Sequence, residues 1–267
     1  MGADAVLGQL QGAIPKAEAF PGEFTAKING ILDKVDSLLS DVPGWLQSMI
    51  SWIVDEAKKL WQQIKDLSAK LLDWLDKNVW PVIRGPFTLW DASNQWTTAV
   101  YHPATTVSGD TNTAKTTVDD WWQGAAATAY GQMIPVQKAA SDKIAEIASK
   151  VKDTLQALCF SLGALYIAIV LLLVGLLLQI DAVAAAIASV VGIPAGLIGA
   201  VATILEAIAG VAAVYAGVNA LATNALGSFN TLLQLQNDNS AFENGHWPKD
   251  AAALGEIGNG SDWHFKG

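Results

Sequence analysis

Side chains that could carry out chemistry are sparse in this sequence and do not stand in catalytic patterns. The three histidines are His102, His246 and His264, and none belongs to a His-Glu-x-x-His zinc motif. Asp119 and Asp120 form a carboxylate pair, but neighbours on a helix point about 100° apart and do not converge on one substrate. The nucleophile elbow, the phosphate-binding loop and the Cys-x-x-Cys motif are missing from the sequence. We therefore expect no enzymatic activity.

Metal and cofactor sites are not expected either. Asp110, Thr111 and Asn112 resemble the start of a calcium loop, but such a loop needs Gly at its sixth position and Glu at its twelfth. The sequence has Lys115 and Trp121 in those places. The single cysteine, Cys159, has no disulfide partner in the chain and stands in an apolar run, which predicts a small buried side chain. The sequence predicts no cofactor and no metal.

Charge and the first residues exclude two further classes. The formal net charge is -9 and Arg84 is the only arginine, so no basic surface for nucleic acid is expected. Residues 1–20 lack a basic start followed by an apolar stretch, which is the pattern of a cleaved secretory signal. Export to the cell envelope or the medium would need a route that does not use such a signal.

The elements that must position any functional residue are strongly apolar in the second half of the chain. Residues 154–237 contain only two charged side chains, Asp181 and Glu206. The run from 159 to 178 has about twenty uncharged residues, which as a helix would cross a hydrocarbon core of ~30 Å. A second run covers 182–205, and the short link at 179–181 predicts a tight helical hairpin with Asp181 at its tip. This surface must be buried, self-associated or inserted in a membrane.

Small residues in this apolar region predict close helix contacts. Gly192 and Gly196 are four residues apart, and Gly199 follows after three more, a spacing that lets helices approach closely in lipid or in a tight soluble bundle. Gly175 is a further small position, and Leu173 lies within the first run. We predict that these five residues belong to a membrane or oligomer interface. Pro194 would bend or split a helix between the glycines.

Helical periodicity dominates the rest of the chain, and strand patterns are nearly absent. Apolar residues at three- and four-residue spacing predict helices over 23–40, over 45–79, and from 125 through 158 into the apolar run. Residues 103–117 are rich in threonine and predict a loop or a weak helix. The expected fold is all-α, an elongated helical bundle. Four of the eleven tryptophans stand on the helix over 45–79, where they would fill a helix–helix contact or anchor a partner or a membrane.

One motif has a clear physical meaning. Trp122, Gln123 and Gly124 precede an alanine-rich segment that ends in Tyr130. Glycine tolerates the positive φ of a tight turn between antiparallel helices, tryptophan packs over the turn, and alanines let the second helix come close. We predict that Trp122, Gly124 and Tyr130 serve secretion or partner pairing rather than catalysis.

These residues resemble the Trp-X-Gly family of substrates exported by the type VII (ESX-type) secretion systems of actinobacteria and related Gram-positive bacteria. The resemblance covers about residues 86–158, and the layout is similar to long members in which the hairpin precedes an Ala/Gly-rich helical region. It implies a helical hairpin, pairing with a small helical Trp-X-Gly-type partner or with the secretion machinery, and export without a cleaved signal. The Tyr-x-x-x-Asp/Glu export signal does not occur after any tyrosine, which implies that a partner chain supplies it.

We divide the sequence into four regions. Residues 1–85 are an amphipathic helical region, 86–158 the Trp-X-Gly-like hairpin, 159–233 an apolar helical hairpin or bundle, and 234–267 an irregular polar tail that would fold back through its two tryptophans. The expected function is that of a non-enzymatic, type VII-secreted helical protein that acts through partner pairing, oligomerisation and membrane insertion. An α-helical pore-forming toxin and a resident membrane protein with several spans are the alternatives.

Overall fold

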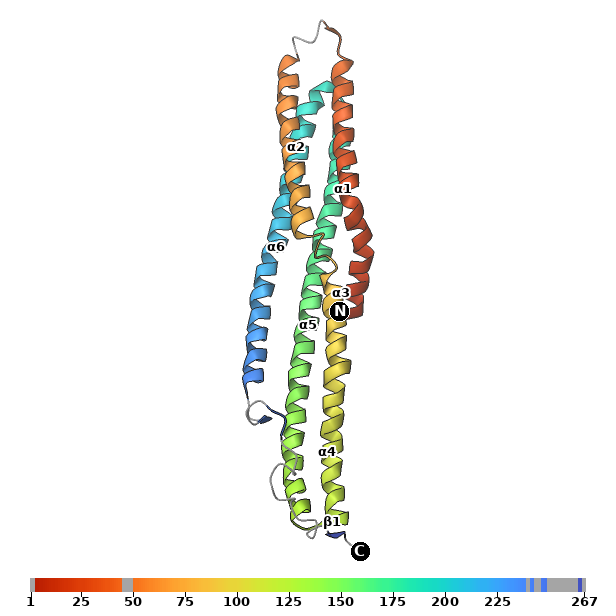
Figure 1. Ribbon diagram of the computed structural model, residues 1–267. Helices are drawn as coiled ribbons and strands as arrows, with labels where there is room; N and C mark the ends of the chain where they lie inside the picture. The colour runs from red at the N-terminus through yellow and green to blue at the C-terminus, as the bar shows by residue number, and fades with distance from the viewer. Residues whose placement is uncertain (1–2, 45–49, 239–240, 243–245, 249–263, 266–267) are drawn as a thin grey trace. The chain divides into compact units, whose positions relative to one another are not determined.

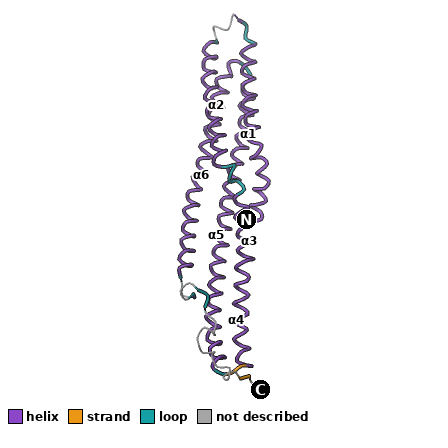
Figure 2. The backbone as a smooth tube through the Cα atoms, in the orientation of Figure 1, coloured by secondary structure: helices purple, strands orange, loops and turns teal. Residues whose placement is uncertain are grey.

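The computed structural model describes residues 3–44, 50–238, 241–242, 246–248 and 264–265. The described chain is almost entirely helical (Figures 1 and 2), which confirms the all-α fold. The α-helices are α1 (Ala3–Ser40), α2 (Ser51–Asn78), α3 (Gly85–Trp96), α4 (His102–Trp121), α5 (Ala125–Ala186) and α6 (Ile193–Asn237). The π-helix η2 (Thr97–Tyr101) and the 3-10 helix η3 (Val190–Gly192) are short, and β1 (Trp122–Gln123) and β2 (His264–Phe265) form a two-stranded sheet.

The chain folds into two compact units, and each unit combines two separate segments. Unit 1 consists of Met1–Phe87 and Cys159–Ala222, and unit 2 of Thr88–Leu158 and Thr223–Gly267. Helices α5 and α6 each contribute one part to unit 1 and the other to unit 2. The division of the sequence into four regions stays a prediction.

The core of unit 1 is a four-helix bundle of α1, α2 and the unit 1 parts of α5 and α6. One cluster of buried residues includes Phe24 of α1, Ile64 of α2, Leu173 of α5 and Ile204 of α6. The predicted apolar stripe of α2 is buried at six of its seven described positions, Ile53, Ala57, Leu60, Ile64, Leu71 and Leu75, and half-buried at Leu67. The stripe members Trp45 and Met49 lie outside the described residues. Burial of one apolar stripe, with charged residues on the other faces, therefore determines how α2 sits in the bundle.

Helix α1 begins twenty residues earlier than the sequence pattern indicated, at Ala3 rather than at 23. It contains Pro15 and Pro21, each of which removes one backbone hydrogen bond. Buried residues at helical spacing continue through both prolines, because Leu10, Ile14, Ala17 and Phe20 all lie in the unit 1 core. Their burial outweighs the lost hydrogen bonds, and the prolines do not end the helix.

The predicted tight turn at 179–181 is wrong. Helix α5 continues without interruption to Ala186, and the chain reverses direction only between this residue and Ile193. Asp181 lies within the helix and forms an ion pair with Lys27 of α1. The amine of Lys34 donates to the Ala184 carbonyl at 2.7 Å. The two lysines of α1 supply the polar partners that the end of α5 needs, so no loop is required at the charge.

Pro194 does not divide a helix, because it is the second residue of α6. In the first turn of a helix the backbone N–H has no intrahelical acceptor, so proline is tolerated there. The predicted close approach occurs at Gly196, where an added Cβ would lie 2.2 Å from Cγ1 of the buried Ile187. At Gly199 the nearest atom to an added Cβ is 3.5 Å away, which is an ordinary contact. These contacts join two parts of the same chain.

We expect opposite effects from alanine at two of these glycines. Gly196→Ala should destabilise the protein by about 1–2 kcal/mol, because the overpacking against Ile187 exceeds the gain in helix propensity. Gly175→Ala should stabilise it by about 0.5–1 kcal/mol, since nothing lies within 4 Å of the added Cβ and alanine is the better helix former. Thermal unfolding followed by circular dichroism measures both. Equal melting temperatures for the two variants would contradict the contact at Gly196.

Unit 2 contains an antiparallel helix pair. Helices α3 and α4 are joined by η2 into one helical run, which lies beside the first half of α5 (Figure 1). The Ser93 hydroxyl donates to the Lys152 carbonyl at 3.4 Å, and the Ser108 hydroxyl donates to Asp142 Oδ1 at 2.5 Å. Residue numbers therefore rise along one helix as they fall along the other. The segment at 103–117, expected as a loop or a weak helix, is part of α4.

Small side chains form the buried contact of this pair. The described residues of unit 2 that are almost fully buried include Ser93, Ala140, Ser141 and Ala148. The predicted stripe on α5, which is Ile144, Ile147, Val151, Leu155 and Leu158, is only half-buried. The sequence pattern therefore missed the face with the alanines and serines, since a scale of side-chain hydrophobicity ranks such residues below isoleucine and leucine.

Candidate interaction sites

The turn at Trp122–Gly124 connects α4 to α5. Gly124 has φ of 111°, which confirms the positive φ expected of this glycine. Its carbonyl accepts the Thr128 N–H at 3.1 Å and the Thr128 hydroxyl at 3.2 Å, so Gly124 begins the hydrogen-bond ladder of α5. The backbone of Trp122 is in β1, and its side chain lies outside the described residues. The turn thus depends on a backbone conformation that only glycine adopts readily.

The end of the chain pairs with this turn. Strand β2 lies antiparallel to β1, with Phe265 opposite Trp122 and His264 opposite Gln123. The tail therefore folds back, as expected, although backbone hydrogen bonding joins it to the rest of unit 2. Trp247, one of the tryptophans expected to bury the tail, is 45% exposed, and Trp263 lies outside the described residues.

The third residue of the motif, Tyr130, lies on the second turn of α5 and is half-buried. Ala127 and Ala129, which precede it, are buried. Small buried side chains at the start of α5 let its neighbour approach closely, which is the role expected of the alanine-rich segment.

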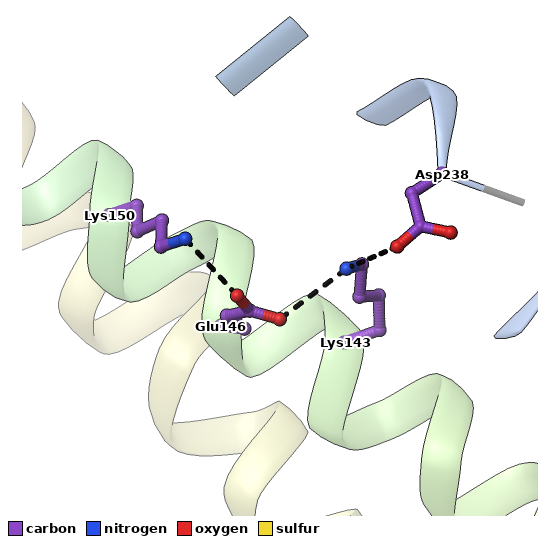
Figure 3. A network of polar contacts seen from close by, with 4 residues as sticks. All are labelled: Lys143, Glu146, Lys150 and Asp238. Carbon is purple, nitrogen blue, oxygen red and sulfur yellow. Dashed lines mark hydrogen bonds and ion pairs between the residues drawn. The ribbon is translucent and has the colours of Figure 1, made fainter. Parts of the chain in front are cut away.

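A network of charged side chains links α5 to the residue that follows α6 (Figure 3). The amine of Lys143 lies 2.8 Å from Asp238 Oδ2 and 3.4 Å from Glu146 Oε2, and Lys150 lies 3.2 Å from Glu146 Oε1. The hydrogen bond to Asp238 raises the pKa of Lys143, and the hydrogen bond from Lys150 lowers the pKa of Glu146. The contribution of Glu146 to the stability of the fold is lost as pH falls through its lowered pKa. The contribution of Lys143 is lost as pH rises through its raised pKa. The network is therefore complete at neutral pH.

A second polar cluster joins α4 to α5. Asp142 accepts the hydroxyl of the buried Ser108 and lies 2.6 Å from the amine of Lys138. The hydrogen bonds from Lys138 and then Ser108 lower the pKa of the Asp142 carboxyl. A carboxylate held by two donors on a helix contact is a structural element. Within the described ranges no three His, Cys, Asp or Glu side chains come together to bind a metal.

An apolar face of unit 1 is open to solvent. Leu171 and Leu178 of α5 are 65% and 66% exposed, and Ile198 and Leu205 of α6 are 55% and 45% exposed. Each pair is seven residues apart, so its two members lie on one side of their helix. We call these four residues, one pair on α5 and one pair on α6, the apolar face; Leu205 also lines a cavity between α6 and α2. Large aliphatic side chains exposed in this way, two turns apart on two helices of one unit, are typical of an interaction surface.

A groove of about 540 Å³ lies between α5 and α6, and Leu171 is the one residue of the apolar face that lines it. Leu171, Leu172 and Gly175 of α5 line it, together with Glu206 of α6. Glu206 is one of the two charges of the long apolar region, and the other, Asp181, is paired with Lys27. Among the described residues Glu206 has no ion-pair partner. The groove combines an apolar lining with a single carboxylate.

The other predicted interface residues are not on this open face. Leu173 is 1% exposed and belongs to the unit 1 core. Gly196 and Gly199 contact Ile187 and Val183 of the same chain, and Gly192 lies in η3. The close contact at Gly163 was not predicted from the sequence. An added Cβ there would lie 2.8 Å from Cγ1 of Val6. No residue spacing marks that contact, since it depends on which helix packs beside α5.

Two helices are long and apolar enough to cross a membrane, over 127–186 and 190–217. In the most apolar 18-residue stretch of each helix, 44% and 33% of the residues, respectively, are buried inside the protein. Length and composition of two helices are weak evidence of membrane association, since core helices of soluble proteins meet the same criterion. Core helices of soluble proteins are mostly buried, so the low burial of these two stretches adds to that evidence.

Comparison of the chain with protein-family models, with curated proteins and with solved structures found no match.

Proposed function

We propose that the protein is a non-enzymatic, type VII-secreted helical protein that acts through partner pairing, self-association and membrane insertion of α5 and α6. The observation that supports this most is the apolar face, Leu171, Leu178, Ile198 and Leu205, together with the adjoining groove. Removing apolar surface from water stabilises an association by about 25 cal/mol per Å². A second copy or a lipid surface would bury this face.

The export part of the proposal rests on the turn between α4 and α5. Its Trp-Gln-Gly sequence, the positive φ of Gly124 and the buried alanines after it are the features expected of a Trp-X-Gly hairpin. The proposed partner is a small helical protein that packs along this hairpin and carries the tyrosine-based export signal.

Alanine at Gly124 tests the role of the turn. An L-residue at positive φ is strained by about 1–2 kcal/mol, so Gly124→Ala should distort the hairpin and reduce both partner co-purification and export. Trp122→Ala should reduce partner binding without this strain. Gly131→Ala is the control, because this glycine lies within α5 and nothing is within 4 Å of an added Cβ. Unchanged export and unchanged co-purification in both Trp122→Ala and Gly124→Ala would refute the role of the motif.

The second candidate function is an α-helical pore-forming toxin. It is favoured by the arrangement in unit 1, where α1 and α2 cover one side of the long apolar helices through contacts such as the Lys27–Asp181 ion pair. Release of these helices would expose a hairpin long enough to span a bilayer. Light scattering together with dye leakage from anionic and neutral liposomes, over a range of pH, separates the two candidates. Self-association without leakage would favour assembly, and leakage by the isolated protein would favour the toxin.

A further inference from the structure

A second cavity in unit 1 is distinct from the groove between α5 and α6. It has a volume of about 260 Å³ and lies between α2 and α6. Its lining is apolar except for one lysine: Leu67, Lys70, Leu71 and Trp74 of α2, and Leu205, Ile208, Val211 and Ala212 of α6. We propose that this cavity binds the chain of a single-chain anionic amphiphile, such as a fatty acid, with its carboxylate on Lys70.

The size of the cavity fits one alkyl chain. An engineered apolar cavity of about 150 Å³ binds benzene, whereas pockets for larger organic ligands have about 300–1,000 Å³. The volume of 260 Å³ lies between these values. An apolar lining offers no hydrogen bonds to a polar ligand body, and a medium-length alkyl chain requires none.

The walls of the cavity are held in place by packing. Leu71 and Val211 are buried and form the inner side. The ring of Trp74 is half-buried and packs edge-to-face on Tyr215 of α6, with ring centroids 5.1 Å apart. This contact fixes the indole beside the cavity, because aromatic pairs prefer such edge-to-face geometry. A preformed wall reduces the entropy that ligand binding must overcome.

The charge at the cavity selects an anionic head group. Lys70 lines the cavity with its aliphatic stem and is exposed to solvent, so its amine reaches toward water at the open side. The acids three and four residues from it on α2 have other partners: Asp73 pairs with Lys77, and Asp66 accepts a hydrogen bond from Gln62. Across the described ranges Lys70 itself has no ion-pair partner. A carboxylate at the end of an alkyl chain in the cavity would supply one.

Calorimetric titration of the full chain with dodecanoate, below its micelle concentration, tests this site. We expect one equivalent to bind, and dodecyltrimethylammonium, which has the same chain and the opposite charge, to bind at least about fivefold more weakly. Lys70→Glu should weaken dodecanoate binding by about fivefold, and added salt should weaken it in the wild type. Lys59→Glu is the matched control, because it makes the same charge change on an exposed lysine of α2 that does not line the cavity.

A second pair of variants tests the position of the alkyl chain. Ala212 and Ala213 are both exposed, but only Ala212 lines the cavity. Ala212→Phe should weaken dodecanoate binding by about tenfold or more, since the ring occupies the opening, and Ala213→Phe should leave it unchanged. Circular dichroism of both variants confirms that α6 is retained.

Three results would overturn the proposal. The first is that the wild-type chain does not bind dodecanoate. The second is that dodecanoate and dodecyltrimethylammonium bind equally well and Lys70→Glu has no effect on binding. The third is loss of binding at protein concentrations where light scattering detects a dimer, which would make a second copy the occupant.

Vesicles of neutral lipid with and without dodecanoate distinguish a free fatty acid from one held in a bilayer. Binding only to the dodecanoate-containing vesicles would place the same site on a membrane-held chain. The binding measurements do not depend on export or on the Trp-X-Gly turn, so they can fail while the proposed function holds, and the reverse.

Discussion

Leu171→Arg is expected to abolish liposome binding and self-association while the helical content stays that of the wild type. The side chain is 65% exposed, so the free energy of unfolding should change by no more than about 0.5 kcal/mol. In a bilayer, however, an arginine near the centre of a span is unfavourable by about 2.5–3.5 kcal/mol, which corresponds to about a hundredfold weaker partitioning. Liposome flotation and light scattering measure the two losses, and thermal unfolding measures the stability.

Leu173→Arg is the informative contrast, only two residues away. Leu173 is 1% exposed in the unit 1 core, so an arginine there would be an unpaired buried charge and should destabilise the fold by about 3–5 kcal/mol or more. Loss of membrane binding in this variant would say nothing about insertion, because the bundle itself would be disrupted. If Leu171→Arg binds liposomes and self-associates like the wild type, the apolar face is not the interaction surface.

A disulfide between Val6→Cys and Gly163→Cys is expected to prevent liposome leakage without preventing liposome binding. Helix α1 approaches α5 closely here, since an added Cβ at 163 would lie 2.8 Å from Cγ1 of Val6. Because Cγ1 is bonded to Cβ of Val6, the two Cβ atoms lie near the ~3.5–4.5 Å separation that a disulfide needs, and cysteine puts a sulfur where the γ-methyl group was. The crosslink keeps α1 on α5, so the buried side of the apolar hairpin cannot enter a bilayer. The apolar face stays exposed and should still contact lipid.

This crosslink should be made in a Cys159→Ala background, because Cys159 is a third, buried cysteine in unit 1. Addition of a reductant should restore leakage to the level of the Cys159→Ala protein, which serves as the control. Full leakage by the oxidised protein would show that α1 does not have to leave α5. In that case any pore would form from the exposed surface alone.

Residue patterns predicted the fold class and the orientation of α2 because those features depend on local periodicity. The buried positions of α2 recur every three or four residues between charged ones, so a single buried face is evident. Gly124 was identifiable because a turn between two helices with a positive φ requires glycine. Such features depend on nearby residues only.

The apolar region could not be predicted in this way, because its residues are apolar on every side of the helix. Leu171 and Leu173 are the same residue type two positions apart, yet one is exposed and the other is in the core. Periodicity cannot distinguish them. The same reason explains the error at Asp181, where a charge in an apolar run indicated a turn. Its partner, Lys27, is 154 residues away in the sequence, and only the packing of α1 on α5 brings them together.

Unit 1 is built from two separate segments, and this affects how the protein folds while it is being synthesised. Residues Met1–Phe87 are made first, but the helices that complete their core come from Cys159–Ala222. At roughly 5–20 residues per second, synthesis of the intervening chain and of that second segment takes on the order of ten seconds. During this interval the apolar sides of α1 and α2 lack the partners that α5 and α6 supply. We therefore expect a chaperone to bind the nascent chain, and the first segment to complete its fold only after the second has been synthesised.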